Sequence, residues 1–527
     1  MRDLTLDPHN NPLALPDVGR KNGPIMALDP IPSPLDHLTL RGAPHRFALH
    51  TSARTLTYSE LEHEVGVLAF SLTRQGLRRG ERVATWLPKT ELACLMPLAA
   101  ARAGVIHVPI NPALRRAQVA HILADSGARA LISAPGRVET LEAGDLPEGC
   151  EIVTDEALRG ATEHMAASSE DPSALAALLY TSGSTGRPKG VMLSHANLWL
   201  GALSVAHYLR LAPDDRTLAV LPLSFDYGQN QLFSTWAAGG CVVPLDYLRA
   251  SDVVRAVERE RITTLAGVPP LWTQLTEVDW PTSARALLKR LTNSGGVLTP
   301  RLSGRLRALF PSADIFAMYG LTEAFRSTYL PPELLDTHPQ SIGRAIPFAD
   351  VMVVRSDGQR AQAGECGELV HAGALVAQGY WNDAARTALR FRPVPEWSKS
   401  GGIAVWSGDT VVADAEGLLS FVGRDDEMIK TSGHRVSPSE IEEAALASGI
   451  VAEAVAFGRA DERLGAVVIL VARATSGVAE ADAQLRAHLK AQLPLFMHPS
   501  EIFWRDTLPR NANGKLDRVA IKSEMGA

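Results

Sequence analysis

The sequence predicts an α/β protein, because short apolar runs alternate with helical periods along most of the chain. Alternation of this kind is typical of parallel sheets covered by helices. A chain of 527 residues is too long for one hydrophobic core, so we expect two or more domains. Hydrophobic residues make up 46% and charged residues 21%, a composition that is ordinary for a soluble globular protein.

The N-terminal segment is predicted to be a flexible extension. Residues 1–34 are rich in Pro, Asn and Asp and show no sustained period, and Met26 is an alternative start. Order is expected to begin near Leu35. Residues 57–60 form a capping box, and apolar side chains then recur at helical spacing until Gly76 ends the helix.

The strands of the N-terminal domain are predicted from apolar runs between helical patterns. From residue 341 to residue 421 the character changes to strand-like runs and Gly-rich turns. We therefore predict a large N-terminal domain, 35–423, built of two α/β subdomains plus a β-rich subdomain at about 341–423. The predicted α/β strands are 82–87, 104–110, 130–133, 175–181, 218–222, 240–245, 263–268 and 313–318.

The C-terminal fifth of the chain is predicted to be a small mobile α+β domain, 427–527, behind a charged hinge at 424–426. Residues 437–440 are a second capping box, with Pro438 at the first helical position.

Composition excludes several classes of function. A formal net charge of −6 gives no basic footprint for nucleic acid. The 4 cysteines are far apart, fit no metal spacing and are interpreted as buried thiols in a reducing compartment. No apolar run is long enough to span a membrane, and no signal-peptide core is present. A cytoplasmic location is the default expectation.

A loop at 180–190 combines hydroxyl side chains, glycines and two cations after a buried strand. Its backbone can approach a polyphosphate closely, and its hydroxyls can donate hydrogen bonds. It is not the common P-loop, because Pro188 rather than Gly precedes Lys189. Taken alone, such a loop is a weak signal, because roughly half of the loops with this composition are plain surface turns.

Six separated segments resemble the motifs of the adenylate-forming superfamily, which includes acyl-CoA synthetases, adenylation domains of peptide synthetases and luciferase-like enzymes. They stand in the family's order and cover nearly everything from Leu35 to the C-terminus. The segments are YTSGSTGRPKG at 180–190, SGGVL at 294–298, MYGLTE at 318–323, GEL at 367–369 with GYWN at 379–382, SGD at 407–409 with GR at 423–424, and PRNANGK at 509–515.

The resemblance implies an ATP-dependent carboxylic acid:CoA ligase (AMP-forming) that makes an acyl-adenylate and then a thioester, with ATP, Mg²⁺ and CoA. It implies that Thr322 contacts the α-phosphate and that Glu323 and Thr185 bind the metal. The implied phosphate-binding residues are Thr181, Ser182, Gly183, Ser184, Thr185, Gly186 and Lys189. The implied adenine- and ribose-binding residues are Gly295, Gly296, Val297, Tyr319, Asp409 and Arg424.

Lys515 gains its importance only from the resemblance. A lysine in a polar Asn-Gly turn is usually a solvated surface residue. Family members swing this lysine into the site, where it bridges the acid and the α-phosphate. The resemblance likewise implies that Asp426 is the hinge position and that Gly433 leaves room for a pantetheine arm.

The predicted acyl pocket contains Phe225, Asp226, Tyr227 and Gly320. Fatty- and aryl-acid enzymes often have His where Phe225 stands, so that pattern is broken. Asp226 matches the aspartate that pairs with a substrate ammonium in amino-acid-activating relatives, or it bonds a nearby backbone N–H; both alternatives stay open. Some exosortase-associated acyl-CoA ligases have a similar Phe-Asp-Tyr-Gly stretch. The chain has Trp-Ser-Gly-Asp at 406–409, where family members more often have an aromatic residue followed by Arg-Thr-Gly-Asp. Asp409 is kept, but the contacts that the Arg and Thr usually make are not expected.

Two other functions compete with CoA ligation. A stand-alone adenylating enzyme would load a carrier protein in trans, through its phosphopantetheine. A non-catalytic nucleotide-binding regulator is disfavoured, because Thr185, Glu323, Asp409, Arg424 and Lys515 are all retained. The expected binding partner is a small-molecule carboxylic acid, and no nucleic acid is expected. A homodimer is one alternative for the oligomeric state.

Overall fold

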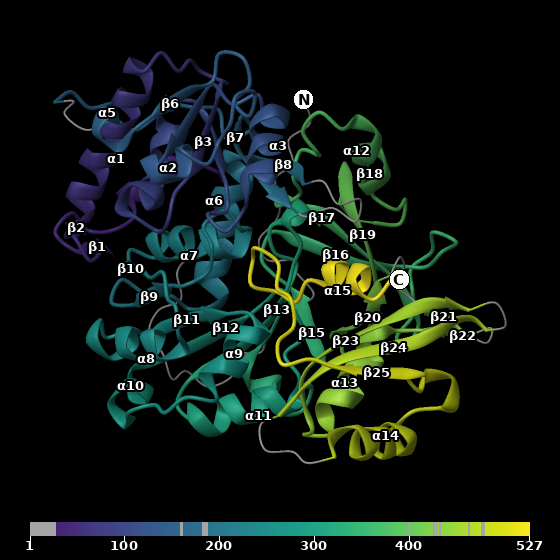
Figure 1. Cartoon of the computed structure of the whole chain (residues 1–527). Coiled ribbons are helices and arrows are strands. Elements are labelled where there is room, and N and C mark those ends of the chain that lie inside the picture. Colours follow the sequence, from purple (N-terminus) through teal and green to yellow (C-terminus); the bar gives the residue numbers. More distant parts are fainter. Residues whose placement is uncertain are drawn as a thin grey trace.

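The computed structural model describes residues 28–158, 162–181, 188–398, 400–424, 427, 429–431, 434–461, 464–475 and 480–526. It confirms the α/β class with a large N-terminal part and a smaller C-terminal part (Figure 1). In the described ranges, no helix has both the length and the apolar character needed to cross a membrane.

The first sheet of the N-terminal part has strand order β6-β5-β3-β4-β7-β8. Its strands pair in parallel except β7 with β8, which form an antiparallel hairpin. The strands are β3 (Arg82–Trp86), β4 (Ile106–Pro109), β5 (Ala130–Ser133), β6 (Glu151–Val153), β7 (Leu175–Thr181) and β8 (Lys189–Ser194).

The second sheet has a parallel centre, β10-β9-β11-β12-β13, and continues on one side through antiparallel strands. The range 341–423, predicted to be β-rich, supplies most of these antiparallel strands, and they share a sheet with the parallel strands. The strands are β1 (Phe47–His50), β2 (Thr55–Thr57), β9 (Arg216–Ala219), β10 (Cys241–Pro244), β11 (Thr264–Gly267), β12 (Arg290–Asn293), β13 (Asp314–Tyr319), β14 (Thr328–Leu330), β15 (Ser341–Ala345), β16 (Ala349–Val354), β17 (Cys366–Gly373), β18 (Phe391–Pro393), β19 (Ile403–Ala413) and β20 (Leu419–Arg424).

Helices cover both sheets and pack around an apolar core that contains the fully buried Trp236, Trp272 and Phe310, and a second apolar core lies between α3 and the first sheet. The helices are η1 (Leu35–Leu40), α1 (Tyr58–Arg74), α2 (Glu91–Arg102), α3 (Arg116–Ser126), α4 (Pro135–Val138), α5 (Asp155–Leu158), α6 (His195–Tyr208), α7 (Asp226–Ala237), α8 (Ala250–Arg259), α9 (Pro269–Leu275), α10 (Thr282–Leu287), α11 (Pro300–Leu309), η2 (Thr322–Ala324), η3 (Pro332–Leu334) and α12 (Ala384–Arg390).

The C-terminal part has its own sheet, β23-β24-β25, and its own apolar cores. It lies against the second sheet, with the yellow loop before α15 reaching back toward β13 (Figure 1). Its elements are β21 (Ile429–Thr431), β22 (His434–Val436), α13 (Pro438–Ala447), β23 (Val451–Asp461), β24 (Gly465–Ala474), α14 (Ala481–Gln492), η4 (Leu495–Met497), β25 (Glu501–Trp504) and α15 (Arg518–Glu524).

The two predicted capping boxes have different outcomes. At α1, the Thr57 side chain accepts from Glu60 N and the Glu60 carboxylate accepts from Thr57 N, as predicted. At α13 the helix begins at Pro438, but the predicted box is wrong. The Ser437 hydroxyl donates to Val422 O at 2.5 Å and makes no cap hydrogen bond. This hydroxyl therefore fastens α13 to β20.

Two further expectations are corrected. The predicted strand 218–222 is β9 and ends at Ala219, because the Leu221 N–H donates to the Gln231 side chain at 3.2 Å instead of to a neighbouring strand. The chain therefore leaves the sheet early and is free to form a loop before α7. The cysteines are not all buried: Cys366 is exposed at the first position of β17, and Cys150 is half-buried.

Candidate active site

The candidate site lies where the parallel strands of the second sheet end. Asp226 begins α7 in the connection after β9, Gly295 follows β12, and Thr322 begins η2 after β13. Carboxyl ends of parallel strands meet at one edge of a sheet, which is where open α/β sheets bind ligands. The Thr322 hydroxyl donates to Asp226 Oδ1 at 3.2 Å, so two of the three segments are in direct contact.

The β7–β8 hairpin holds the two ends of the predicted phosphate loop, with Thr181 opposite Lys189. The loop residues Ser182, Gly183, Ser184, Thr185 and Gly186 lie outside the described residues. The Thr181 hydroxyl is buried and has no hydrogen-bond partner among the described residues. A buried hydroxyl of this kind needs an acceptor, and a phosphate oxygen would supply one.

Lys189 and Glu323 meet at a third residue, Tyr380. The Lys189 ammonium is 3.0 Å from Glu323 Oε1 and donates to the Tyr380 hydroxyl at 2.7 Å. That hydroxyl donates to the same Glu323 oxygen at 2.6 Å. Burial opposes ionisation of Glu323, but Lys189 and Tyr380 outweigh it and hold its pKa below the ordinary value. An ionised, buried carboxylate is a hard oxygen donor of the kind that Mg²⁺ prefers.

Replacing Tyr380 by Phe should weaken this arrangement without removing a charge. The loss of a hydrogen bond to a charged group costs about 1.5–3 kcal/mol, but Lys189 still holds Glu323. For the substrates that the resemblance implies, we therefore expect KM for MgATP to rise roughly tenfold in Tyr380→Phe, with little change in KM for the carboxylic acid. Steady-state kinetics measure both, and Tyr247→Phe, a half-buried tyrosine outside this cluster, is the control. An unchanged KM for MgATP would remove Tyr380 from the nucleotide site.

Asp409 lies on β19, directly opposite Arg424 on β20. It accepts a hydrogen bond from the Tyr319 hydroxyl, and Arg424 Nη1 is 3.5 Å from Asp409 Oδ1. The predicted adenine- and ribose-binding residues Tyr319, Asp409 and Arg424 are therefore brought together. Asp409 belongs to a strand and not to a surface turn, and its carboxylate can face a diol.

Lys515 reaches the same space from the C-terminal part of the chain. Asn111 Nδ2 donates to Ala512 O at 2.6 Å and fixes this loop against the first sheet's side of the site. The Lys515 ammonium lies 4.9 Å from the centre of the Phe225 ring. A Cβ on Gly295 would approach Lys515 Cε to 2.4 Å, and Gly295 has φ of +77°. Only glycine admits both that conformation and the lysine.

Burial lowers the pKa of Lys515, and the negative charge of Asp226 opposes that change. Burial raises the pKa of Asp226, and Arg326 and Lys515 oppose that change. Each of these groups therefore lies in a desolvated space with other charges near it.

The predicted acyl-pocket residues fill the space beside Lys515. Phe225 and Tyr227 are buried, with ring centroids 6.3 Å apart in an edge-to-face arrangement. The Tyr227 hydroxyl donates to Thr292 O at 2.7 Å, which leaves its ring to form a wall. Gly320 packs against the backbone of Arg326.

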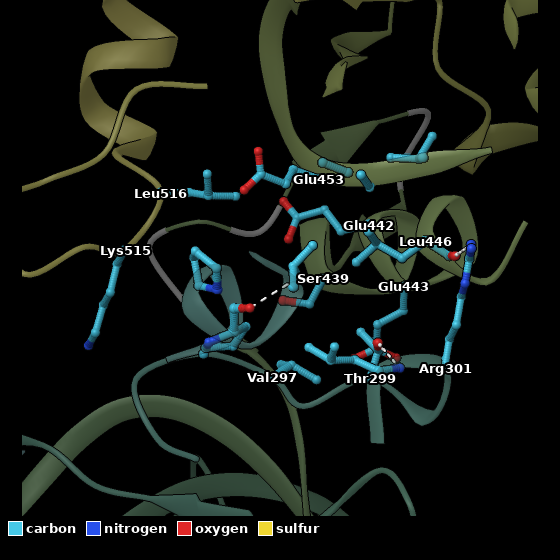
Figure 2. Close-up of a pocket in the computed structure, with 18 of the residues that line it drawn as sticks. Val297, Thr299, Arg301, Ser439, Glu442, Glu443, Leu446, Glu453, Lys515 and Leu516 are labelled. Carbon is cyan, nitrogen blue, oxygen red and sulfur yellow. Dashed lines mark hydrogen bonds between the residues drawn. The ribbon is translucent and has the colours of Figure 1, made fainter. Parts of the chain in front are cut away.

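A cavity of about 460 Å³ separates the two parts of the chain. Gly296 and Val297 line it from the N-terminal part, and Glu442 and Glu443 line it from α13. Figure 2 shows Lys515 at one end of this cavity, pointing away from the glutamates. The volume is in the range of small-molecule sites, about 300–1,000 Å³.

The sequence matches the AMP-binding enzyme family over residues 38–381 and the AMP-binding enzyme C-terminal domain over residues 440–515. The chain belongs to the AMP-binding enzyme family. The predicted superfamily is thereby confirmed, and so is the fold class.

Relatives of this AMP-binding enzyme are of two lengths. A plipastatin synthase protein of Bacillus subtilis is 32% identical over 92% of this chain, but the match spans only 19% of that protein. Malpibaldin synthetase of Mortierella alpina is 32% identical over 91% of this chain, and there the match spans 9%. Feruloyl-CoA synthase of an Amycolatopsis species is 31% identical over 92% of this chain and 97% of the relative. This chain therefore spans only a small part of the long synthases and nearly all of the CoA synthase.

Solved AMP-binding structures have the same fold. ATP-bound MatB from Rhodopseudomonas palustris is 27% identical, with a TM-score of 0.85 over 94% of this chain and 99% of that one. O-succinylbenzoate coenzyme A synthetase (MenE) from Bacillus subtilis, in complex with ATP and magnesium ion, is 27% identical, with a TM-score of 0.81 over 93% and 99%.

Sequence motifs missed three residues of this AMP-binding enzyme that the fold brings to the site: Asn111, Arg326 and Tyr380. Tyr380 stands inside the quoted GYWN segment, so its hydroxyl could have been considered. Asn111 and Arg326 carry no local signal, because their partners lie far away in the sequence. Asp426 and Gly433, the predicted hinge and thiol-tunnel residues, lie outside the described residues.

Glu443 gives this cavity a pH dependence. Burial, with help from Glu442 and Glu440, raises the pKa of Glu443 to about 7 from 4.5. The folded chain therefore holds a proton that the unfolded chain has released, and stability should fall as pH rises from 4.5 to about 7. Partial exposure limits the effect to about 1–2 kcal/mol. Thermal unfolding measured between pH 4.5 and about 7 should show no such fall in stability for Glu443→Gln. Glu480→Gln, a change at an exposed residue in the same part of the chain, should show the same fall as the unaltered protein.

Proposed function

We propose that this chain is an ATP-dependent carboxylic acid:CoA ligase that forms an acyl-adenylate and then a thioester. One observation carries the proposal: Lys515 crosses from the C-terminal part into the space beside Gly295, where Asp226 and Thr322 also lie. A cation delivered there is suited to a carboxylate that attacks the α-phosphate of ATP.

A free carboxylate is a poor acyl donor, because its leaving group would be oxide. Transfer of AMP to it gives a mixed anhydride with a good leaving group. Negative charge develops between the acid and the α-phosphate, and the Lys515 ammonium stabilises it there. Glu323 with Thr185 would hold Mg²⁺, which would neutralise charge on the phosphates. With Lys515 in the site, the C-terminal part would help to exclude water from the anhydride.

The second half-reaction needs a different face of the C-terminal part. We propose that 35–423 form the body, 424–426 the hinge and 427–527 a lid, with Asp426 changing its backbone angles. Hinges are a few linker residues that absorb a large dihedral change. Gly433 would then leave room for the pantetheine arm of CoA.

The relatives support CoA as the acceptor more strongly than a carrier protein. The match with the feruloyl-CoA synthase covers 92% of this chain and 97% of that protein, whereas the long synthases are matched over a fifth of their length or less. A carrier protein loaded in trans is the second candidate, favoured by the Phe-Asp stretch at 225–226. We propose a cytoplasmic location, in which free thiols such as those of the four cysteines stay reduced. A homodimer is a separate proposal, which sedimentation would test.

Substrate-dependent ATP–pyrophosphate exchange across fatty, aryl, amino and dicarboxylic acids tests the first half-reaction. Parallel reactions with CoA and with a phosphopantetheinylated carrier then identify the acceptor. Exchange with at least one acid class and thioester formation with CoA are expected. Lack of exchange with every acid would favour a non-catalytic nucleotide-binding protein.

A further inference from the structure

Three charged groups at the candidate site lie near enough to act on one another electrostatically. Asp226 lies at the start of α7, Arg326 follows η2, and Lys515 comes from the C-terminal loop. Both cations act electrostatically on Asp226. Among the described residues, however, none of the three forms a salt bridge. Buried charges without a partner are costly, so a ligand that supplies the missing charges would stabilise them.

Arg326 is the most deeply buried of these groups, with 2% of its surface exposed. Its Nη1 donates to Ser294 Oγ at 2.5 Å, and its guanidinium lies 4.7 Å from the centre of the Tyr227 ring. Its Nε has no hydrogen-bond partner among the described residues. A guanidinium with one side fixed and another donor free is prepared for a carboxylate.

Two acceptor-capable groups near Arg326 are also without partners. Asn230 Oδ1 and Thr264 Oγ1 are buried and make no hydrogen bond in the described structure. Together with Arg326 and Tyr227 they line a small cavity of about 20 Å³. A single water needs about 10–15 Å³, so this cavity takes one small polar group and no aryl or alkyl chain.

The two cations are held by a pair of touching rings. Lys515 lies over Phe225, Arg326 lies over Tyr227, and the ring centroids are 6.3 Å apart. An acid whose reacting carboxylate meets Lys515 would therefore reach Arg326 after a short chain. A plain hydrocarbon tail would leave the buried polar groups near Arg326 without hydrogen-bond partners. A site with such groups therefore discriminates against an acid with a hydrocarbon tail.

We propose that the acid activated by this enzyme is a short one with a second carboxylate, and that Arg326 binds that second carboxylate. This inference rests on the proposed adenylation of a carboxylic acid. In this arrangement the Asp226 carboxylate lies beside the middle of the substrate. A substrate ammonium group there would pair with the charge of Asp226, whereas a methylene group would not. Aspartate and glutamate on one side, and succinate and glutarate on the other, separate these two cases.

The test is ATP–pyrophosphate exchange by the full chain with these four diacids, with butyrate and valerate as matched monoacids, and with long-chain and aryl acids. A short diacid should exchange at least roughly a hundredfold faster than its matched monoacid. Arg326→Gln should raise KM for the diacid roughly 10–100-fold and leave KM for MgATP unchanged, while Arg355→Gln, an exposed arginine, should change neither.

Arg326→Lys keeps the charge and should recover part of the loss. If Arg326→Gln does not fold, the acid panel on the unaltered enzyme still decides. Faster exchange with monoacids, or an equal rise in KM for MgATP, would overturn the inference and leave the ligase proposal standing. Absence of exchange with every acid would instead overturn the ligase proposal itself.

Discussion

Lys515→Ala is expected to lower the rate of adenylation by roughly 10²–10³ and to spare thioester formation from a supplied acyl-adenylate. Removal of one preorganised group at developing charge costs about 3–4 kcal/mol. The lysine is placed by the loop that Asn111 fixes, with its ammonium near Phe225 and against Gly295. In the second half-reaction this loop is proposed to have left the site, so its lysine should not matter there.

Exchange of pyrophosphate measures the first half-reaction, and CoA consumption from synthetic acyl-adenylate measures the second. Lys490→Ala, an exposed lysine on α14, is the control and should alter neither. Equal loss of both half-reactions would contradict the proposed division of labour.

The pH profile gives an independent check on Lys515. Burial lowers its pKa, with Asp226 opposing, so the ammonium should lose its proton below the ordinary lysine range. The adenylation rate should therefore fall as pH rises through that lowered pKa. An arginine at this position stays protonated, so Lys515→Arg should move the fall to higher pH. A profile that is identical in the two enzymes would assign the alkaline limb to another group.

The fold class could be predicted, and nucleotide-binding residues could be proposed, because their signals are local. A glycine-rich loop after a buried strand, or a Thr-Glu pair after another, is readable within ten residues of sequence. Pairing across the fold is not readable in that way. Tyr380 and Glu323 are 57 residues apart, and Asn111 and Ala512 are 401 apart, so no window of sequence contains both partners.

Two errors show the same limit at the level of single hydrogen bonds. Ser437 stands where a cap is expected, but its hydroxyl donates to Val422 O on β20 and accepts no hydrogen bond from the first turn of α13. Leu221 continues an apolar run, but its N–H is taken by a glutamine of α7, and the strand ends sooner. In both cases local propensity is overridden by a tertiary partner. The early end of β9 matters for function, because it releases the loop that leads to Asp226.

Glu323→Gln is the second change with a large expected effect. The structure holds this carboxylate ionised by contact with Lys189 and Tyr380, at the first turn after β13. A neutral amide keeps the shape but loses the charge that a hard cation needs. We expect the adenylation rate to fall by roughly 10²–10³ and the Mg²⁺ concentration for half-maximal rate to rise.

Titration of Mg²⁺ at fixed ATP separates a metal role from a structural one. The amide leaves Lys189 without its anion, so some loss of stability is expected in any case, about 1–3 kcal/mol. Stability loss alone would lower the amount of active enzyme and leave the Mg²⁺ dependence unchanged. Glu333→Gln, an exposed change on η3, should match the unaltered enzyme in both respects. A rise in the Mg²⁺ concentration for half-maximal rate supports Mg²⁺ binding by Glu323, and an unchanged Mg²⁺ dependence would contradict it.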